Sequence, residues 1–437
     1  MEDHAERIVN EAVKQGAQDA VAEVIADRNY QIRFAQNEPV IVNQWRKDTG
    51  NLFLAYNKRV VSGEITNFDR IPEAVGTLIK VARASQENPD YRGIAKGPFK
   101  YARPTPDKKI LSLDDGSDYV EAAVNGALEE GAKECAGSFW RYNDAHYLHT
   151  SNGASGFDHR AGVYLSIRAL LSLESSGHGV SCATKLSQFN PESAGHKAGK
   201  IAKLAKNPKG GAPGKYDIVF DPLILGSLID QVGHRASAYY VETGFSPYGK
   251  KVGKKIASDA VTIVDDGSAD SLARRKFDEE GVPTRKKAIV QKGVLKTYLH
   301  NTSTAKKYKT KTTGNAGLVA PEPHALWLQP GDWTRDELFE EVKDGLWLTN
   351  TWYTRFQSYV TGDFSTIPRD GIFRIKDGEV AGALKDIRLS DNLLNVWKSI
   401  KGISKKAEQV TWWGEVDVPT FAPYALATKI GITKSAM

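Results

Sequence analysis

Two side chains with complementary chemistry stand close together near the middle of the chain. Asp230 and His234 belong to the segment Ile229-Asp230-Gln231-Val232-Gly233-His234. A histidine nitrogen is a common zinc ligand, and a carboxylate can act as a general base on a metal-bound water. Side chains of these two types could therefore take part in metal-assisted hydrolysis.

The flanking sequence predicts a helix that carries both residues. Tyr216–Phe220 is typical of a strand, and Asp221-Pro222 after it can cap and begin a helix that extends to about Val241. Five residues at about 100° each turn a side chain by roughly 140° from its starting face. Positions 229 and 234, the two ends of this segment, would therefore face different sides of a regular helix.

The N-terminal half mixes both kinds of secondary structure. Apolar residues at near-helical spacing predict a helix over residues 5–26, and short β-prone runs between residues 29 and 66 predict an antiparallel meander. The remaining predicted elements are helices over Ile71–Ala84, Asp118–Glu134 and Ala194–Ala205, and strands over Ala145–Ser151 and Gly162–Leu173.

A Gly- and Pro-rich segment predicts where this half ends. Residues 207–215 include Pro208, Gly210, Gly211 and Pro213, and no apolar period crosses them. We place a domain of residues 1–206 before this linker and one of residues 216–437 after it. The second contains repeated β-prone runs from Ala257 onward, which predicts mainly antiparallel sheet. The expected class is α+β, with a mixed N-terminal domain and a β-rich C-terminal domain.

Composition limits the possible functions. The 437 residues include 41% hydrophobic and 26% charged side chains, the profile of a globular protein. Lys and Arg number 59 against 53 Asp and Glu, and this net +6 is too small and too dispersed to favour a nucleic-acid partner. Cys135 and Cys182 form no CxxC pair, and no apolar run approaches about 18 residues. We expect a cytoplasmic protein without disulfides or a membrane partner.

Other motifs favour structural interpretations. Gly244–Lys251 nearly matches a phosphate-binding loop, but Lys251 replaces the required hydroxyl, so a turn is favoured. His146 and His149 would face opposite sides of a strand. The basic clusters at 250–255, 285–287 and 306–311 are expected on solvated loops.

A set of ordered motifs resembles the TldD/PmbA family of peptidases (peptidase family U62), and most of all its PmbA/TldE branch. The motifs are Thr262–Gly267, Phe277–Thr284, Gly293–Leu299, Asn301–Ala305, Thr312–Ala316, Val360–Ser365, Ile375–Glu379 and Ile387–Leu393. The resemblance extends to nearly the whole chain, and it implies the same two-part fold as the pattern analysis.

The resemblance also implies what the middle segment once did. In the TldD branch, two histidines of an HExxxH element and a cysteine near the C-terminus hold the metal, and the glutamate is the general base. Here Ile229 stands at the first histidine, Asp230 at the glutamate, and only His234 keeps its identity. The segment Gln409–Glu415 offers no cysteine. Ile229 suits packing better than catalysis.

Two functions remain open from these residues. In the first, the chain is a TldE-like subunit of a TldD/TldE metallopeptidase complex (heterodimer) that degrades or processes unfolded peptides, with no cofactor of its own and zinc in a TldD-type partner. In the second, it is an autonomous metallopeptidase or homodimer with a divergent site that includes His234. A replacement ligand set from His300, His324, Asp278, Glu279 or Glu280 matches no known spacing. The aromatic residues Trp352, Tyr353 and Phe356 could line a chamber, a subunit contact or the core.

Overall fold

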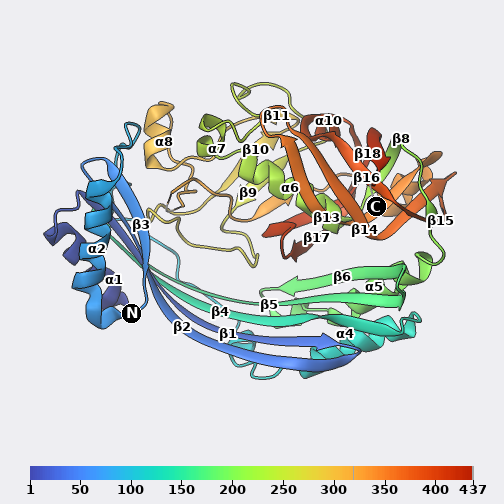
Figure 1. The fold of residues 1–437 in the computed structure, drawn as a ribbon, viewed down its shortest axis with the longest axis horizontal. Coiled ribbons are helices and arrows are strands. Elements are labelled where there is room, and N and C mark those ends of the chain that lie inside the picture. Colours follow the sequence, from blue (N-terminus) through green and yellow to red (C-terminus); the bar gives the residue numbers. More distant parts are fainter. Residues whose placement is uncertain (318, 436–437) are drawn as a thin grey trace.

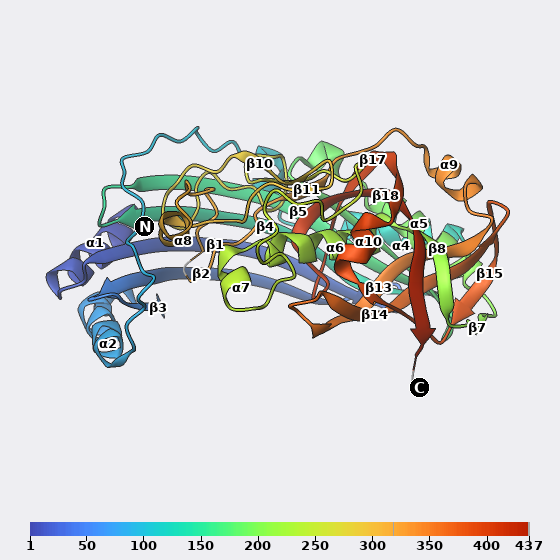
Figure 2. The same cartoon turned by 90° about the horizontal axis from the view of Figure 1, so that it is seen from above.

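The structure is a computed structural model that describes residues 1–317 and 319–435. Each half of the chain builds one large β-sheet. In Figure 1 the strands of the first sheet form a long curved layer beneath the second sheet, and Figure 2 shows the same strands running along the longest axis of the molecule. None of the described helices is both long and apolar enough to span a lipid bilayer.

The first sheet is antiparallel, with strand order β3-β2-β1-β4-β5-β6. Its strands are β1 (Asp19–Ala35), β2 (Glu38–Tyr56), β3 (Arg59–Ile65), β4 (Glu134–Thr150), β5 (Ser155–Ser172) and β6 (Ser175–Ala183). The helices of this half are α1 (Glu2–Lys14), α2 (Ile71–Ala84), α3 (Lys108–Leu111), α4 (Ser117–Glu129) and α5 (Pro191–Leu204).

Alternation along these strands assigns each face of the sheet a different neighbour. On β1, Val24 packs with α1 and α2, and Ile32 packs with α4 and α5, so this face carries the helices. The opposite face of the sheet contacts the second half: Val21 packs with Phe277, and Cys182 Sγ donates to Gln409 O at 2.9 Å. The concave face of the first sheet is therefore the face that meets the rest of the chain.

The predicted helix over residues 5–26 is wrong in its second half. The helix ends at Lys14, Gly16 adopts φ +101°, and β1 begins at Asp19. β1 is paired on both edges and covered on both faces, so its apolar residues do not alternate cleanly with polar ones. Long-range pairing with β2 and β4 overrides a spacing that locally resembles a helix.

The second sheet has twelve strands, most of them antiparallel. They are β7 (Lys209–Gly210), β8 (Gly214–Phe220), β9 (Ile263–Asp266), β10 (Lys286–Gln291), β11 (Val294–Leu295), β12 (Leu326–Leu328), β13 (Asp344–Ser358), β14 (Asp363–Lys376), β15 (Glu379–Lys385), β16 (Ile387–Asn392), β17 (Ile400–Trp412) and β18 (Val416–Lys434). Helices α6 (Pro222–Arg235), α7 (Ala238–Glu242), α8 (Thr302–Lys307), α9 (Arg335–Glu340) and α10 (Leu393–Lys398) accompany them. The expected α+β class is confirmed.

The helix that was predicted to reach Val241 is interrupted. α6 ends at Arg235 because Ser237 takes an extended conformation and forms a β-bridge with Leu299. The Leu299 N–H donates to Ala236 O at 2.8 Å, and the Ala238 N–H donates to Leu299 O at 3.0 Å. α7 then starts as a separate short helix.

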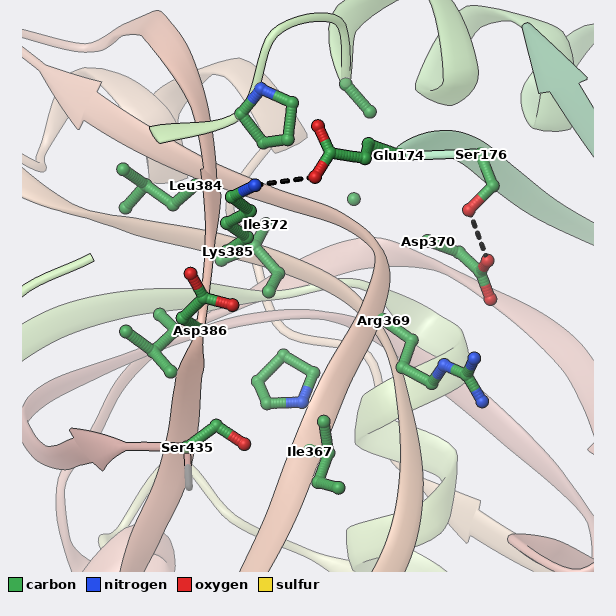
Figure 3. Close-up of a pocket in the computed structure, with 15 residues that line it drawn as sticks. Glu174, Ser176, Ile367, Arg369, Asp370, Ile372, Leu384, Lys385, Asp386 and Ser435 are labelled. Carbon is green, nitrogen blue, oxygen red and sulfur yellow. Dashed lines mark hydrogen bonds and ion pairs between the residues drawn. The ribbon is translucent and has the colours of Figure 1, made fainter. Parts of the chain in front are cut away.

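The two sheets are also joined at the end of β5 and β6. A cavity of about 320 Å³ lies there, and Figure 3 shows Glu174 and Ser176 of the first half facing Lys385 and Asp370 of the second. Lys385 Nζ lies 2.6 Å from Glu174 Oε1, and Ser176 Oγ donates to Asp370 Oδ1 at 2.8 Å.

Candidate functional site

α6 carries both candidate residues and lies close against the second sheet. Asp221 is its N-cap residue and Pro222 its first residue, where the missing N–H is not needed. The helix contacts β18, β13 and β17. A Cβ at Gly226 would lie 2.6 Å from Val410 Cγ2, and one at Gly233 would lie 2.5 Å from Leu326 Cδ1. The two glycines therefore allow an approach that other residues would block.

Asp230 and His234 are neighbours that do not form a hydrogen bond. Asp230 is 2% exposed, and its Oδ1 accepts a hydrogen bond from the Val418 N–H at 3.0 Å. His234 Nε2 lies 3.6 Å from the same oxygen, beyond hydrogen-bond distance, and the His234 side chain is 28% exposed. The structure thus brings the two candidates together at the end of α6.

Electrostatics keeps both side chains neutral. Burial raises the pKa of Asp230 to about 8, and the carboxylates of Asp417 and Glu415 add to this effect against the Val418 hydrogen bond. Burial lowers the pKa of His234. At neutral pH a protonated carboxyl therefore faces a neutral imidazole, and the pair is not an ion pair. It can hold or exchange a proton.

The hairpin of β17 and β18 supplies two acidic residues that the sequence analysis missed, Glu415 in the turn and Asp417 at the start of β18. Glu415 is 5% exposed, and its Oε1 accepts from the Thr354 N–H at 3.2 Å while its Oε2 accepts from Thr354 Oγ1 at 2.7 Å. Asp417 is exposed and acts on the pKa of both Asp230 and His234. The sequence near Gly414 shows only that two acidic residues are close together. It does not show their contact with α6, because Val418 and Asp230 are 188 positions apart.

The aromatic segment of β13 lies against the same turn. The rings of Trp352 and Trp412 lie 5.5 Å apart, and those of Trp352 and Trp413 lie 6.2 Å apart. Tyr353 is 49% exposed, and Phe356 is partly buried beneath the Arg235 guanidinium, which lies 5.0 Å from its ring centre. The segment is therefore partly exposed and is not a core strand.

The residues considered as replacement ligands are engaged in structural hydrogen bonds. Asp278 accepts from the backbone N–H groups of Glu280, Val282 and Ala316, and Glu280 accepts from those of Ala95 and Thr302. His324 Nε2 lies 2.9 Å from the Gly314 carbonyl oxygen, and His300 Nδ1 lies 3.2 Å from Thr304 Oγ1. Burial raises the pKa of Glu279 to about 8. These side chains lie in loops of the second half, away from α6 in sequence, and stabilise those loops.

The weaker motifs have structural roles. His146 is buried with its Nδ1 2.8 Å from Glu23 Oε1, whereas His149 is partly exposed. Cys135 and Cys182 are free thiols. Residues 244–251 form turns, as predicted. One lysine in the basic clusters is not solvated as expected: Lys287 Nζ lies 2.6 Å from the fully buried Asp265 carboxylate.

With this geometry in place, comparison with known proteins assigns the chain to a family. The family model of the PmbA/TldA metallopeptidase C-terminal domain matches residues 213–434, which include α6 and strands β8 to β18 of the second sheet. The chain belongs to the PmbA/TldD family. The resemblance stated from its motifs is thereby confirmed.

Curated metalloproteases match about half of the chain. A metalloprotease of Methanothermobacter thermautotrophicus is 35% identical over 48% of this chain and 46% of its own length. A metalloprotease of Methanocaldococcus jannaschii is 32% identical over 49% of this chain and 48% of its own length. The chain thus spans about half the length of the curated relatives it matches.

Solved structures extend the likeness to the whole fold. TldE from Thermococcus kodakarensis superimposes with a TM-score of 0.85 at 18% identity, over 98% of this chain and 100% of its own. A Thermotoga maritima protein described as a candidate modulator of DNA gyrase gives a TM-score of 0.85 at 21% identity, over 99% of this chain and 100% of its own. Both halves therefore share the PmbA/TldE architecture.

Membership of a metallopeptidase family raises the question of whether this site fits a metal ion. A catalytic zinc ion needs about three protein ligands. Ile229, at the position of the first ligand, is 0% exposed and lies in the core of the second sheet. Within residues 1–317 and 319–435, no three His, Cys, Asp or Glu side chains are grouped to hold a metal. Asp230 and His234 do not fit a three-ligand zinc site.

Proposed function

We propose that this chain is the non-catalytic, TldE-like subunit of a two-component metallopeptidase. A TldD-like partner supplies the zinc ion, and this chain helps to enclose and hold an unfolded peptide. The catalytic step takes place on the partner. Neither a nucleic acid nor a membrane is part of this proposal.

The burial of Ile229 carries the proposal. A metal ligand must present a donor atom to the ion, whereas Ile229 presents an aliphatic side chain to a closed core. The helix around it is otherwise well formed, with an N-cap, a first-turn proline and two closely packed glycines. A retained scaffold without ligands is what a partner subunit requires.

Co-expression tests the proposal. The chain is produced with a TldD-like protein from the same genome, the complex is purified, and zinc is quantified in the complex and in each separated subunit. We expect stoichiometric zinc in the partner, and cleavage of an unfolded peptide only when the partner is present. Stoichiometric zinc and peptide cleavage by this chain alone would overturn the proposal.

The variant His234→Ala distinguishes the proposed non-catalytic subunit from an autonomous peptidase with a divergent metal site. Under that alternative, His234→Ala removes bound metal and activity. Under the proposal, complexes that contain His234→Ala retain the zinc content and cleavage rate of the wild-type complex. The size of the purified assembly distinguishes a heteromeric complex from a homodimer.

A further inference from the structure

An open groove of about 850 Å³ lies between the concave face of the first sheet and the hairpin β17–β18. Its floor is formed by β1, β4, β5 and β6, and its opposite wall includes Trp412 and Trp413. In Figure 1, the strands of this floor pass beneath β17. Neither the candidate pair on α6 nor the proposed metallopeptidase partner accounts for this groove.

Aromatic rings line the groove on both sides. On the floor, the rings of Trp140 and Tyr142 stack at 5.7 Å, and Trp45, which is outside the groove lining, stacks on Trp140 at 5.2 Å. On the wall, Trp413 is 81% exposed. Exposed, pre-ordered aromatic rings provide binding area for an apolar or aromatic side chain at a small entropic cost.

A buried hydrogen-bond network fixes the protons on the groove floor. The Thr351 N–H donates to Asn350 Oδ1 at 2.7 Å, so Asn350 Nδ2 is the atom that faces His178 and Asp370. Nδ2 lies 2.9 Å from His178 Nδ1 and 3.1 Å from Asp370 Oδ2, so its two hydrogens have one acceptor each. Nδ1 is then an acceptor, and the proton of the neutral imidazole is on Nε2.

This proton position decides what Ser166 can do. His178 Nε2 lies 2.8 Å from Ser166 Oγ, a distance that a serine–histidine catalytic pair would also show. Because Nε2 carries the proton, His178 donates to Ser166 and cannot accept its proton. Burial lowers the pKa of His178 to about 3, which keeps the ring neutral. Ser166 is therefore not an activated nucleophile. Its own hydroxyl hydrogen can be donated to the neighbouring Tyr164 hydroxyl oxygen or to an acceptor in the groove.

Arg33 provides a cation without a counterion at the same floor. It is exposed, and the described residues place no carboxylate within ion-pair distance of its guanidinium. Arg168, the other arginine of the groove, is held by Asp370 at 2.8 Å. Asp417 is the single acidic side chain among the described residues that line the groove. The groove thus contains one cation without an ion-pair partner among the described residues, Arg33 on β1, and one acid, Asp417 on β18.

The register of the sheet sets the distance between the two donors. Arg33 pairs with Ser138, and Ser138 pairs with Ser166, so the three share one row and one face. Two strand spacings separate Arg33 and Ser166 by about 10 Å. An extended peptide advances about 3.3 Å per residue. If its carboxylate binds Arg33, a backbone carbonyl up to three residues away can therefore lie opposite Ser166.

We propose that this groove binds a peptide segment that carries a carboxylate next to an apolar or aromatic side chain. Arg33 binds the carboxylate, Ser166 donates to a peptide carbonyl, and the tryptophans hold the side chain. The assignment rests on the proposed function, because it names the kind of peptide that the subunit holds. The carboxylate belongs either to the peptide C-terminus or to an acidic side chain.

Fluorescence anisotropy of a labelled peptide tests this assignment. The probe is a hexapeptide of glycine and alanine that ends in phenylalanine, labelled at its N-terminus with an uncharged dye that has no carboxylate, as the free acid or as the amide. A third probe is the amide with glutamate before phenylalanine. The wild-type chain is expected to bind the free acid about tenfold more tightly than the plain amide, because a guanidinium–carboxylate bond is charge-assisted. Tighter binding of the glutamate probe would identify a side-chain carboxylate as the source.

Variants assign this preference to the named residues. Arg33→Gln is expected to abolish the preference for carboxylate probes, and Arg33→Lys to retain part of it. Ser166→Ala is expected to weaken the acid and the amide about equally. The matched control is Arg46→Gln, an exposed arginine of β2 whose side chain lies on the opposite face by strand alternation, and it should keep the full preference.

The outcomes distinguish this inference from the function on which it rests. Equal binding of the three probes by the wild-type chain, or an unchanged preference in Arg33→Gln, would overturn the groove assignment. That result leaves a zinc-dependent complex with a TldD-like partner intact. Conversely, binding of the carboxylate probes needs neither metal nor partner, so it can succeed even if no such complex forms.

Discussion

Two histidines of this molecule stand in opposite situations. His234, which the motif resemblance predicted as a ligand position, lies 3.6 Å from Asp230 and is partly exposed. His178 is 4% exposed and is held at both ring nitrogens, by Asn350 and by Ser166. A metal site needs ligands that are oriented by further hydrogen bonds. Hydrogen bonds therefore orient the histidine ring of the groove, His178, whereas the ring of His234 on α6 is not held in this way.

The same contrast separates the two aspartates. Burial acts to raise the pKa of Asp370, but the Arg168 guanidinium and the hydrogen bonds to the carboxylate together outweigh it, and the pKa is lowered. Asp230 has no such cation within ion-pair distance among the described residues and keeps a raised pKa. Asp370 is therefore a buried anion that orients its neighbours, whereas Asp230 is a buried acid.

The largest effect is expected from Asp370→Ala. The change leaves Arg168, Asn350 and Ser176 without their shared acceptor, and the loss of one partner from a buried charged network is strongly destabilising. We expect the free energy of unfolding to fall by about 3 kcal/mol in urea titrations. Asp259→Ala, which changes an aspartate 80% exposed at the side chain, should change it by less than about 0.5 kcal/mol. Equal effects of the two variants would contradict the contrast.

The effect of Asp230→Asn is expected to depend on pH. The pKa of Asp230 is about 8 in the folded chain and about 3.9 when unfolded, so between these values only the folded state holds the proton. Wild-type stability from this group is full below pH 4 and is lost as the pH rises to about 8. Asparagine does not titrate and can keep the Val418 hydrogen bond. The Tm of the variant relative to wild type should therefore increase from pH 5 to pH 8 and then level off. A constant difference across this range would show that Asp230 is ionised when folded.

The smallest effect is expected from His234→Ala. Its ring is partly exposed and lies beyond hydrogen-bond distance of Asp230, so the free energy of unfolding should change by less than about 1 kcal/mol. His178→Ala removes a buried ring between two hydrogen-bond partners and should cost about 2 kcal/mol. Urea titrations of both variants at pH 7 measure the difference. A larger loss for His234→Ala would reverse the ranking of the two histidines.

Much of the fold could be predicted from local signals. The apolar spacing of Ile71–Ala84 indicated a helix with those bounds, and the structure has α2 there. Ile229 was expected to suit packing, and it is buried together with Leu223, Leu225 and Leu228 of α6. Residues 5–26 failed because β1 is specified by its partners and not by its own spacing. The domain boundary at 207–215 stays a prediction.

The site and the groove differ in how far the sequence could reach them. Asp230 and His234 stand within one short segment, so their types and spacing could be read directly. The groove joins His178 to Asn350 across 172 positions, and its floor comes from four strands. The character of Ser166 depends on which atom of a distant amide faces the imidazole. No local pattern encodes that choice.

The two carboxylate oxygens of Asp370 accept hydrogen bonds from different halves of the chain, Oδ1 from Ser176 of the first half and Oδ2 from Asn350 of the second. Its Oδ1 faces Ser176 in the cavity of Figure 3, and its Oδ2 holds Asn350, which orients His178 beneath the groove. Strands of the first half supply Ser166, yet the direction of its hydroxyl hydrogen is set by a carboxylate of the second half. An isolated first half would keep the strands of the groove floor but would lack Asn350 and Asp370, which set the hydrogen positions on His178 and Ser166. Both halves are thus needed for the groove. If the chain were cut between them, the two pieces would have to reassemble before the Ser166 hydroxyl hydrogen pointed into the groove.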